Sequence, residues 1–270
     1  MWIDLKPAGD TAFTLDIAPA ISVGPADRLF MFGGVGLGAS LTALERVTGR
    51  PLVWASAQYE SYARPGETVT FTVDERVRGN QVSQARVSAT TADGREVLTV
   101  VSALGARDMA ERGQWTLAPR VPPPDDCRPR KLWDGRHPDD IHSRVEFRIA
   151  KGSMHGPRSG GGPAPDGNIV MWARPNPAVL PGHAIDTAFI AVVADYVPSG
   201  VGPSLGRDAG GNSLDNSIRF HRRVPTDWLL CDVQIHGVAG GFAHGRMHIF
   251  ARTGELIATA SQSLILRLWD

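Results

Sequence analysis

The stretch "HAIDTAFIAVVADYV", residues 183–197, decides the fold that this sequence predicts. Its core, Ala184 to Ala194, is apolar almost all round, a pattern typical of a helix that is covered on most of its sides. The alternating segment "SRVEFRI" (143–149) and a long Pro- and Gly-rich loop precede it, and four apolar segments with the pattern of antiparallel strands follow it. A single sheet curled around one central helix would cover such a helix.

The first part of the chain repeats this order of signals. The alternating segment "TAFTLDI" leads to the helix-like "VGLGASLTALERV" (35–47), and strand-like segments separated by turn signals such as Asp93-Gly94 come next. Order, spacing and turn chemistry agree between the two parts without high residue identity, which indicates an internal repeat. We therefore predict an α+β double hotdog: two repeats, each with an antiparallel sheet wrapped around a central helix.

The composition changes between about Arg107 and Arg174, where stretches rich in Pro, Gly and charge exclude long regular elements. We predict an N-terminal hotdog repeat at 1–108, a Pro-rich linker at 109–138 and a C-terminal repeat at 139–270 that carries the active site. The two units would pair sheet to sheet, which closes edges that otherwise invite aggregation. Pairing of two copies into a homo-oligomer through the outer sheet faces is left open.

Charge and cysteine content narrow the class of protein. The 270 residues include 28 Lys and Arg and 28 Asp and Glu, so no net field favours nucleic acid or an anionic membrane surface. Cys127 and Cys231 are too few and too far apart for a disulfide framework or a cysteine metal site. No leader-like segment opens the chain and no apolar run reaches membrane-spanning length. We expect a cytoplasmic protein without nucleic-acid or membrane partners.

Residues 34–39, "GVGLGA", fit the relaxed dinucleotide fingerprint G-x-G-x-x-G/A. A true fingerprint lies in a βαβ unit with a parallel second strand, whereas here a series of antiparallel hairpins follows. The corresponding segment 183–197 has no glycine fingerprint at all. We interpret Gly33, Gly34, Gly36 and Gly38 as small residues that let the first helix start tightly and lie close against its sheet.

Four segments together resemble the acyl-CoA thioesterase II family. "FGGVGLGASLTALERV" and "SAQYESYARPGETVTFTV" are similar to its first half, and "NSLDNSIRFHRRVPTDWLL" and "GELIATASQS" to its second. The similarity covers most of the chain outside 107–170. The resemblance implies a double-hotdog enzyme that hydrolyses acyl-CoA thioesters with an Asp, a Thr or Ser hydroxyl and a Gln around the attacking water.

Carried over residue by residue, the family pattern places the catalytic groups on Asp195, Ser213 and Gln262. Ser213 stands where the family usually has Thr, which keeps the hydrogen-bonding hydroxyl but loses a methyl group that restricts the rotamer. Asp195 follows an apolar helix, so we expect partial desolvation to raise its pKa toward that of a useful base. The reaction requires no metal and no cofactor beyond the coenzyme A of the substrate.

Comparison of the two repeats favours a single site. Glu45 aligns with Asp195, Ser102 with Gln262, and Ala55 with Ser213, so only the second repeat keeps all three polar groups. We interpret Glu45 as a structural remnant.

Other features carry less weight. His244 and His248 lie in a strand-like segment without an evident third ligand, so we expect exposed histidines rather than a metal site. His221-Arg222-Arg223 is as well explained by a solvated basic turn as by contact with coenzyme A phosphates. Two other functions stay open: a hotdog hydratase or dehydratase, although neither helix has the His and Asp element those enzymes usually carry, and a non-catalytic acyl-CoA-binding protein.

Overall fold

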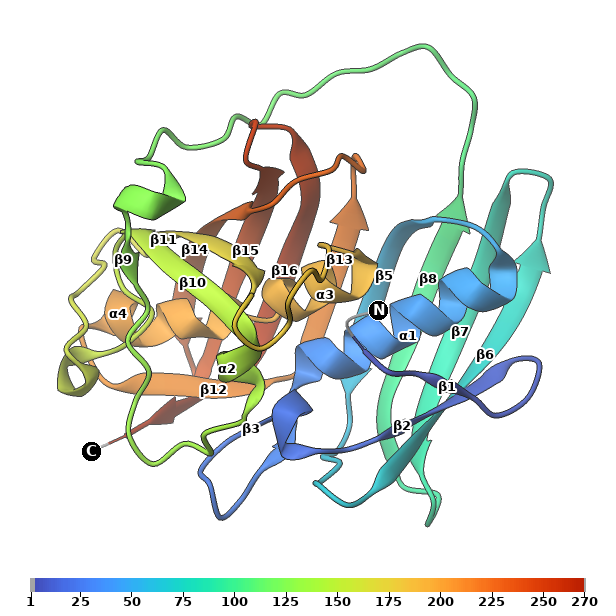
Figure 1. The fold of residues 1–270 in the computed structure, drawn as a ribbon, viewed down its shortest axis with the longest axis horizontal. Helices are drawn as coiled ribbons and strands as arrows, with labels where there is room; N and C mark the ends of the chain where they lie inside the picture. The colour runs from blue at the N-terminus through green and yellow to red at the C-terminus, as the bar shows by residue number, and fades with distance from the viewer. Residues whose placement is uncertain (1–2, 270) are drawn as a thin grey trace.

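The computed structural model describes residues 3–269, in which one continuous sheet curves around two central helices (Figure 1). The first half contains helix α1 (Gly33–Thr48), a short 3-10 turn at Pro19–Ile21 and eight strands. The strands are β1 (Lys6–Pro7), β2 (Ala12–Asp16), β3 (Ser22–Val23), β4 (Phe30–Met31), β5 (Leu52–Tyr59), β6 (Thr68–Arg78), β7 (Val82–Thr91) and β8 (Glu96–Gly105).

The second half contains helix α3 (Thr187–Ala194), the short helices α2 (Ile141–Arg144) and α4 (Val201–Leu205), and the 3-10 turns η2 (Pro124–Asp126), η3 (Pro157–Ser159) and η4 (Val197–Gly200). Its strands are β9 (Arg128–Pro129), β10 (Val145–Lys151), β11 (Asn168–Pro175), β12 (Ala209–Ser213), β13 (Asp215–Phe220), β14 (Leu229–Ala239), β15 (Phe242–Ala251) and β16 (Leu256–Leu268).

The two halves join where β5 pairs antiparallel with β13. The strand order is β1-β2-β6-β7-β8-β5-β13-β16-β15-β14-β11-β10-β9, with β12 paired to β16, so the main sheet has fourteen strands. The hydroxyls of Ser56 and Ser217 lie 2.7 Å apart across the junction. The α+β architecture is the predicted one. Because one sheet runs through both halves, the predicted boundaries at 108 and 139 stay predictions.

The glycines of α1 pack mainly against helix α3. This corrects the sequence interpretation, which placed them against the sheet. A Cβ on Gly34 would lie 2.8 Å from the Val192 Cα, and one on Gly38 would lie 3.0 Å from the Ala188 carbonyl oxygen. Gly36 instead faces the side chain of Leu98 on β8. Small residues therefore let the first half of α1 lie directly against α3, with Gly34 near the C-terminal end of α3 and Gly38 near its N-terminal end.

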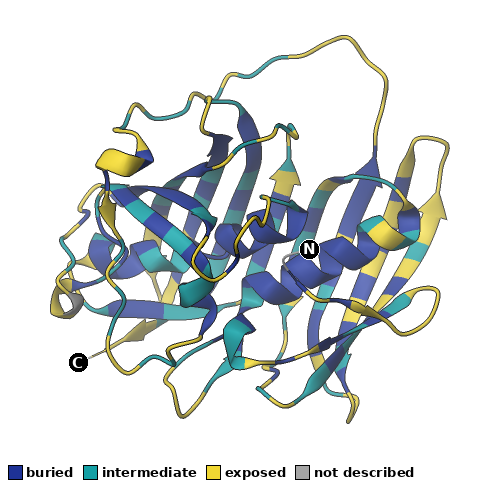
Figure 2. Cartoon of the chain, viewed as in Figure 1, coloured by how far each residue is buried: buried dark blue, intermediate teal, exposed yellow. Residues whose placement is uncertain are grey.

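Two predictions for the second half need correction. The helix begins at Thr187 rather than Ala184, because the Asp186 side chain accepts a hydrogen bond from the Phe189 N–H at 2.8 Å and caps the helix there. Residues 168–175, which the sequence predicts as part of a long loop, form strand β11. Its residues are buried almost without alternation (Figure 2), so the period-2 pattern that marks a half-exposed strand is missing.

The Pro-rich linker explains that burial, because it covers the outer face of the second half. Trp172 on β11 packs in a hydrophobic cluster with Cys127 and donates its indole N–H to the Pro122 carbonyl at 3.0 Å. Gln114 bonds to the backbone of Gly254 and Leu256. This face of the sheet is therefore occupied by the chain itself.

The segment Thr187–Leu205, which comprises α3, η4 and α4, is long and apolar enough by composition to cross a membrane, contrary to the sequence expectation. However, 78% of that window is buried inside the protein. We interpret it as the core helix of the second half, covered by the sheet and by α1.

Candidate active site

Asp195 ends α3 and is buried, with 5% of its surface exposed. Its Oδ2 accepts a hydrogen bond from the backbone N–H of Gly34 at 2.6 Å, in the first turn of α1. Its Oδ1 accepts hydrogen bonds from the side-chain amides of Asn216 on β13, at 3.3 Å, and of Gln262 on β16. Three elements therefore hold this carboxylate, and one of them belongs to the first half of the chain.

Opposing influences set the charge state of Asp195. Burial is the larger one and raises the pKa of the carboxyl to about 7. The hydrogen bonds from Gly34, Gln262 and Asn216 act in the other direction. The positive end of the α1 dipole also favours the ionised form. The carboxyl can therefore change protonation state near neutral pH, as a general base requires.

The structure brings Asp195, Ser213 and Gln262 together. The Gln262 Nε2 donates both to the Asp195 Oδ1 and to the Ser213 Oγ, the latter at 3.1 Å. Ser213 is the last residue of β12, and Gln262 lies opposite Gly245 in the neighbouring strand. Their catalytic roles stay predictions. The sequence comparison did not single out Asn216, although it lies in the segment "SLDNSIRF" and is a completely buried amide in a strand.

Three buried polar atoms around this carboxylate lack a hydrogen-bond partner within residues 3–269: the Tyr59 Oη, the Asn216 Oδ1 and the Gln262 Oε1. Asn216 lies close to the Tyr59 hydroxyl but not in good hydrogen-bond geometry. Buried polar groups of this kind are usually satisfied by water or by a ligand. These three oxygen atoms can therefore accept hydrogen bonds from a water molecule or a ligand bound in the site.

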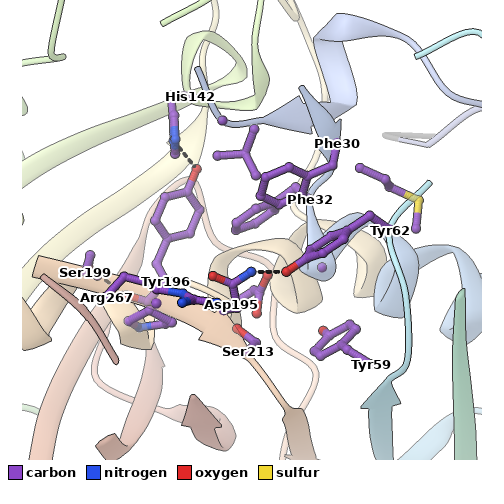
Figure 3. Close-up of a pocket in the computed structure, with 18 of the residues that line it drawn as sticks. Phe30, Phe32, Tyr59, Tyr62, His142, Asp195, Tyr196, Ser199, Ser213 and Arg267 are labelled. Carbon is purple, nitrogen blue, oxygen red and sulfur yellow. Dashed lines mark hydrogen bonds between the residues drawn. The ribbon is translucent and has the colours of Figure 1, made fainter. Parts of the chain in front are cut away.

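A cavity of about 610 Å³ opens onto Asp195 and Ser213 (Figure 3). One wall is apolar and comes from the first half, with side chains such as Phe30, Phe32 and Leu98. A cavity with an apolar wall and a few convergent polar groups suits a small-molecule substrate. Within the described residues, no group of three or more His, Cys, Asp or Glu side chains is arranged to hold a metal ion.

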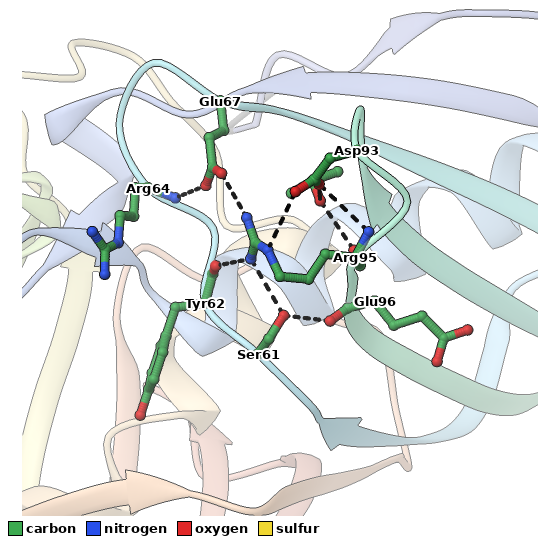
Figure 4. A network of polar contacts seen from close by, with 8 residues as sticks. Ser61, Tyr62, Arg64, Glu67, Asp93, Arg95 and Glu96 are labelled. Carbon is green, nitrogen blue, oxygen red and sulfur yellow. Dashed lines mark hydrogen bonds and ion pairs between the residues drawn. The ribbon is translucent and has the colours of Figure 1, made fainter.

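The loop after β5 carries Tyr62 to the rim of this cavity and is held by Arg95 (Figure 4). The Arg95 Nη2 lies 2.6 Å from the Glu67 Oε1, and its Nη1 donates to the Tyr62 carbonyl oxygen. Glu67 also accepts a hydrogen bond from the backbone N–H of Arg64. The "ARPG" motif thus belongs to a loop that is fixed against the hairpin joining β7 and β8, and the Tyr62 side chain extends from it.

A second polar group lines the cavity and was missed by the sequence comparison. The Tyr196 hydroxyl lies 3.0 Å from the His142 Nδ1, and the Arg130 Nη1 lies 3.2 Å from the same nitrogen. Tyr196 directly follows Asp195 in the chain, which was the one available signal. Arg130 and His142 lie in the segment 107–170, to which the family resemblance does not extend.

Glu45 lies at the opposite end of the helix pair and has different partners. Its Oε1 accepts hydrogen bonds from the Leu52 N–H at 3.1 Å and from Arg223, which also donates to the Thr187 hydroxyl. Ser102 donates to the Ala85 carbonyl in the neighbouring strand. These partners are consistent with the predicted structural role of Glu45.

Comparisons with known proteins agree with this architecture. The model of the acyl-CoA thioesterase C-terminal domain family matches residues 124–266. A candidate thioesterase from Novosphingobium aromaticivorans is 33% identical with a TM-score of 0.86, and the match covers 97% of this chain and 98% of that one. A search of curated proteins found no match.

More distant structures share the fold. A hotdog-fold protein from Alicyclobacillus acidocaldarius is 18% identical with a TM-score of 0.82, covering 98% of this chain and 96% of that one. The acyl-CoA thioesterase II of Mycobacterium marinum is 19% identical with a TM-score of 0.71, covering 100% and 96%. The hotdog prediction is confirmed, and the fold and matches define a thioester hydrolase. The chain belongs to the acyl-CoA thioesterase family.

Proposed function

We propose that this protein hydrolyses an acyl-CoA to a free acid and coenzyme A, with a water molecule held by Asp195, Ser213 and Gln262. The observation that supports this most directly is the pair of hydrogen bonds donated by the Gln262 Nε2, to the Asp195 Oδ1 and to the Ser213 Oγ. They bring a buried base, a hydroxyl and an amide together, and the base and the hydroxyl line the same cavity.

In this mechanism the ionised Asp195 accepts a proton from the water while the water oxygen attacks the thioester carbonyl carbon. The Gln262 Oε1, which has no hydrogen-bond partner among residues 3–269, accepts the second hydrogen of that water. The tetrahedral intermediate then collapses and the carbon–sulfur bond breaks. The leaving thiolate takes up the proton held by Asp195, so the free acid and the thiol of coenzyme A are the products.

The developing oxyanion needs hydrogen-bond donors. The Ser213 hydroxyl accepts from Gln262, which leaves its own O–H free to donate to the substrate carbonyl. Gly33 lines the cavity at the first turn of α1, where backbone N–H groups point outward and the helix dipole favours negative charge. We assign the oxyanion position to the space between these two groups.

The assay is release of free thiol from a panel of acyl-CoAs. The Asp195→Asn variant should lose about 100-fold or more in kcat on the best substrate, because general-base catalysis typically contributes that much. Glu45→Gln changes the residue that aligns with Asp195 in the other repeat and should keep activity close to that of the wild type. Equal rates for wild type and Asp195→Asn would refute the mechanism.

The same panel separates the alternatives. Tight binding of acyl-CoAs without thiol release at any chain length would favour a non-catalytic binding protein. Turnover of an enoyl-CoA without thiol release would favour a hydratase.

A further inference from the structure

The far wall of the cavity is built by the end of the linker and the beginning of the second repeat. Arg130, Trp133, His142, Met154 and His155 all line the cavity and come from residues 130–155. Tyr196 joins them from the other side, through its hydroxyl contact with His142 (Figure 3). These residues therefore line the same cavity as Asp195, the proposed base, and they contact Tyr196, which follows Asp195 in the chain.

Arg130 is the centre of this group. Its guanidinium lies 5.5 Å from the ring centroid of Tyr196 and 5.4 Å from that of Phe147. Its Nη1 lies 3.2 Å from the His142 Nδ1, and its Nε donates to the His155 Nε2 at 3.4 Å. Because arginine can only donate, both histidine nitrogens act as acceptors and both rings are neutral.

The surroundings keep these histidines neutral and leave the arginine charge unbalanced. Burial and the nearby Arg130 hold the pKa of His142 well below its usual range and lower that of His155 to about 4. Arg130 forms no ion pair within residues 3–269. The carboxylate that acts on it, Asp140, is already bound to Arg136 at 2.7 Å. Because Asp140 is paired with Arg136, no ion pair within residues 3–269 offsets the positive charge of the Arg130 guanidinium.

From this geometry we infer that the cavity wall around Arg130 binds an anionic oxygen group of the substrate. This inference rests on the proposed function. A guanidinium with neutral acceptors and aromatic faces around it, but no carboxylate of its own, can form charge-assisted hydrogen bonds with an incoming anion. Two parts of an acyl-CoA carry such a group. One is a carboxylate at the end of a short acyl chain, and the other is a phosphate of coenzyme A.

Binding of non-hydrolysable thioethers tests the inference without any need for turnover. S-(4-carboxybutyl)-CoA and S-pentyl-CoA have chains of equal length and differ by the terminal carboxylate, and S-pentyl-pantetheine lacks the nucleotide phosphates. Affinities are measured by titration calorimetry on the wild type and on Arg130→Gln. Loss of a charge-assisted contact should weaken the ligand that uses it by about 10- to 100-fold.

The pattern of losses identifies the anion. Weaker binding of the carboxybutyl ligand alone assigns Arg130 to an acyl carboxylate. Equal weakening of both CoA ligands, with S-pentyl-pantetheine unaffected, assigns it to a coenzyme A phosphate. Unchanged affinities, or equal weakening of all three ligands, would overturn the inference. Since no step is hydrolytic, these outcomes are independent of whether Asp195 is the base.

Arg128→Gln is the matched control, because it removes the same charge from an exposed position on β9 two residues away. It should leave all three affinities unchanged. Arg130→Lys provides a second variant in case the Gln variant does not fold. It keeps the charge but not the planar fork, so the same ligand should be weakened by a smaller factor.

Discussion

Asp195 combines deep burial with three hydrogen-bond donors, and this combination makes its ionisation sensitive to pH near neutrality. Burial raises its pKa to about 7, whereas the unfolded chain would titrate near 3.8. A general base acts only in its ionised form. We expect kcat/KM to rise with pH and level off above an apparent pKa of about 7, as measured by thiol release over a pH series. A rate that is already maximal near pH 5 would exclude Asp195 as the base.

The same shift has a consequence for stability. Because the folded-state pKa is the higher one, folding favours the protonated carboxyl, and that contribution is lost as pH rises from about 4 to about 7. Asp195→Asn carries no such titration. Between about pH 5 and pH 8, the unfolding free energy of the wild type should fall relative to that of Asp195→Asn by roughly 3 kcal/mol. Denaturant unfolding at the two pH values measures this, and a difference that does not vary with pH would contradict it.

At the residue scale, the sequence predicted that Asp195 is buried, but it did not predict the groups that contact the Asp195 carboxylate. The apolar run before Asp195 indicated burial, and the family resemblance pointed to Ser213 and Gln262. The contact with the Gly34 N–H could not be predicted, because it joins residues far apart in the chain and depends on how the two helices pack. The same holds for Arg130, since the resemblance does not extend to its segment.

Close packing of α1 against α3 sets the position of the carboxylate, and the glycines of α1 permit it. Gly34→Ala would place a methyl group 2.8 Å from the Asp195 Cβ and from the Val192 backbone, which cannot move aside easily. We expect the free energy of unfolding to fall by about 1–3 kcal/mol, as in overpacked cores. Denaturant unfolding measures the change.

Gly36→Ala is the comparison, because its new methyl group would meet the ends of the Leu98 and Met31 side chains rather than backbone. Side chains can rotate away, and alanine is the better helix former by about 1 kcal/mol. This variant should therefore lose less stability than Gly34→Ala. The reverse order would show that contact between the two helices does not limit the packing.

At the element scale, the sequence predicted the two central helices and the strands with one exposed face, and it failed at a strand whose two faces are both covered. The hairpin turn at Asp93-Gly94 was predicted, and Gly94 has the positive φ angle that such a turn requires. Strand β11 was missed because the linker buries its outer face, so its apolar residues do not alternate with polar ones. A covering segment far away in the sequence is not visible in a local pattern.

At the scale of the whole molecule, the linker covers the outer face of the sheet in the second half and shields it from solvent. Trp172→Phe keeps most of the ring in the cluster with Cys127 but removes the hydrogen bond to the Pro122 carbonyl. We expect a loss of about 1 kcal/mol in the free energy of unfolding. Turnover of acyl-CoA should not change, because Trp172 does not line the cavity. Equal stability of the two proteins would mean that this contact does not hold the linker.

Residues 106–112, which follow β8 and include the beginning of the linker, are all exposed. The Gly34 N–H precedes this segment in the chain and the Asp195 carboxylate follows it, and the two groups form one hydrogen bond. A chain divided there would give two fragments, neither of which contains a complete site. Recovery of hydrolysis on mixing would report their reassembly, so this enzyme could be divided to sense whether two proteins fused to its halves come together.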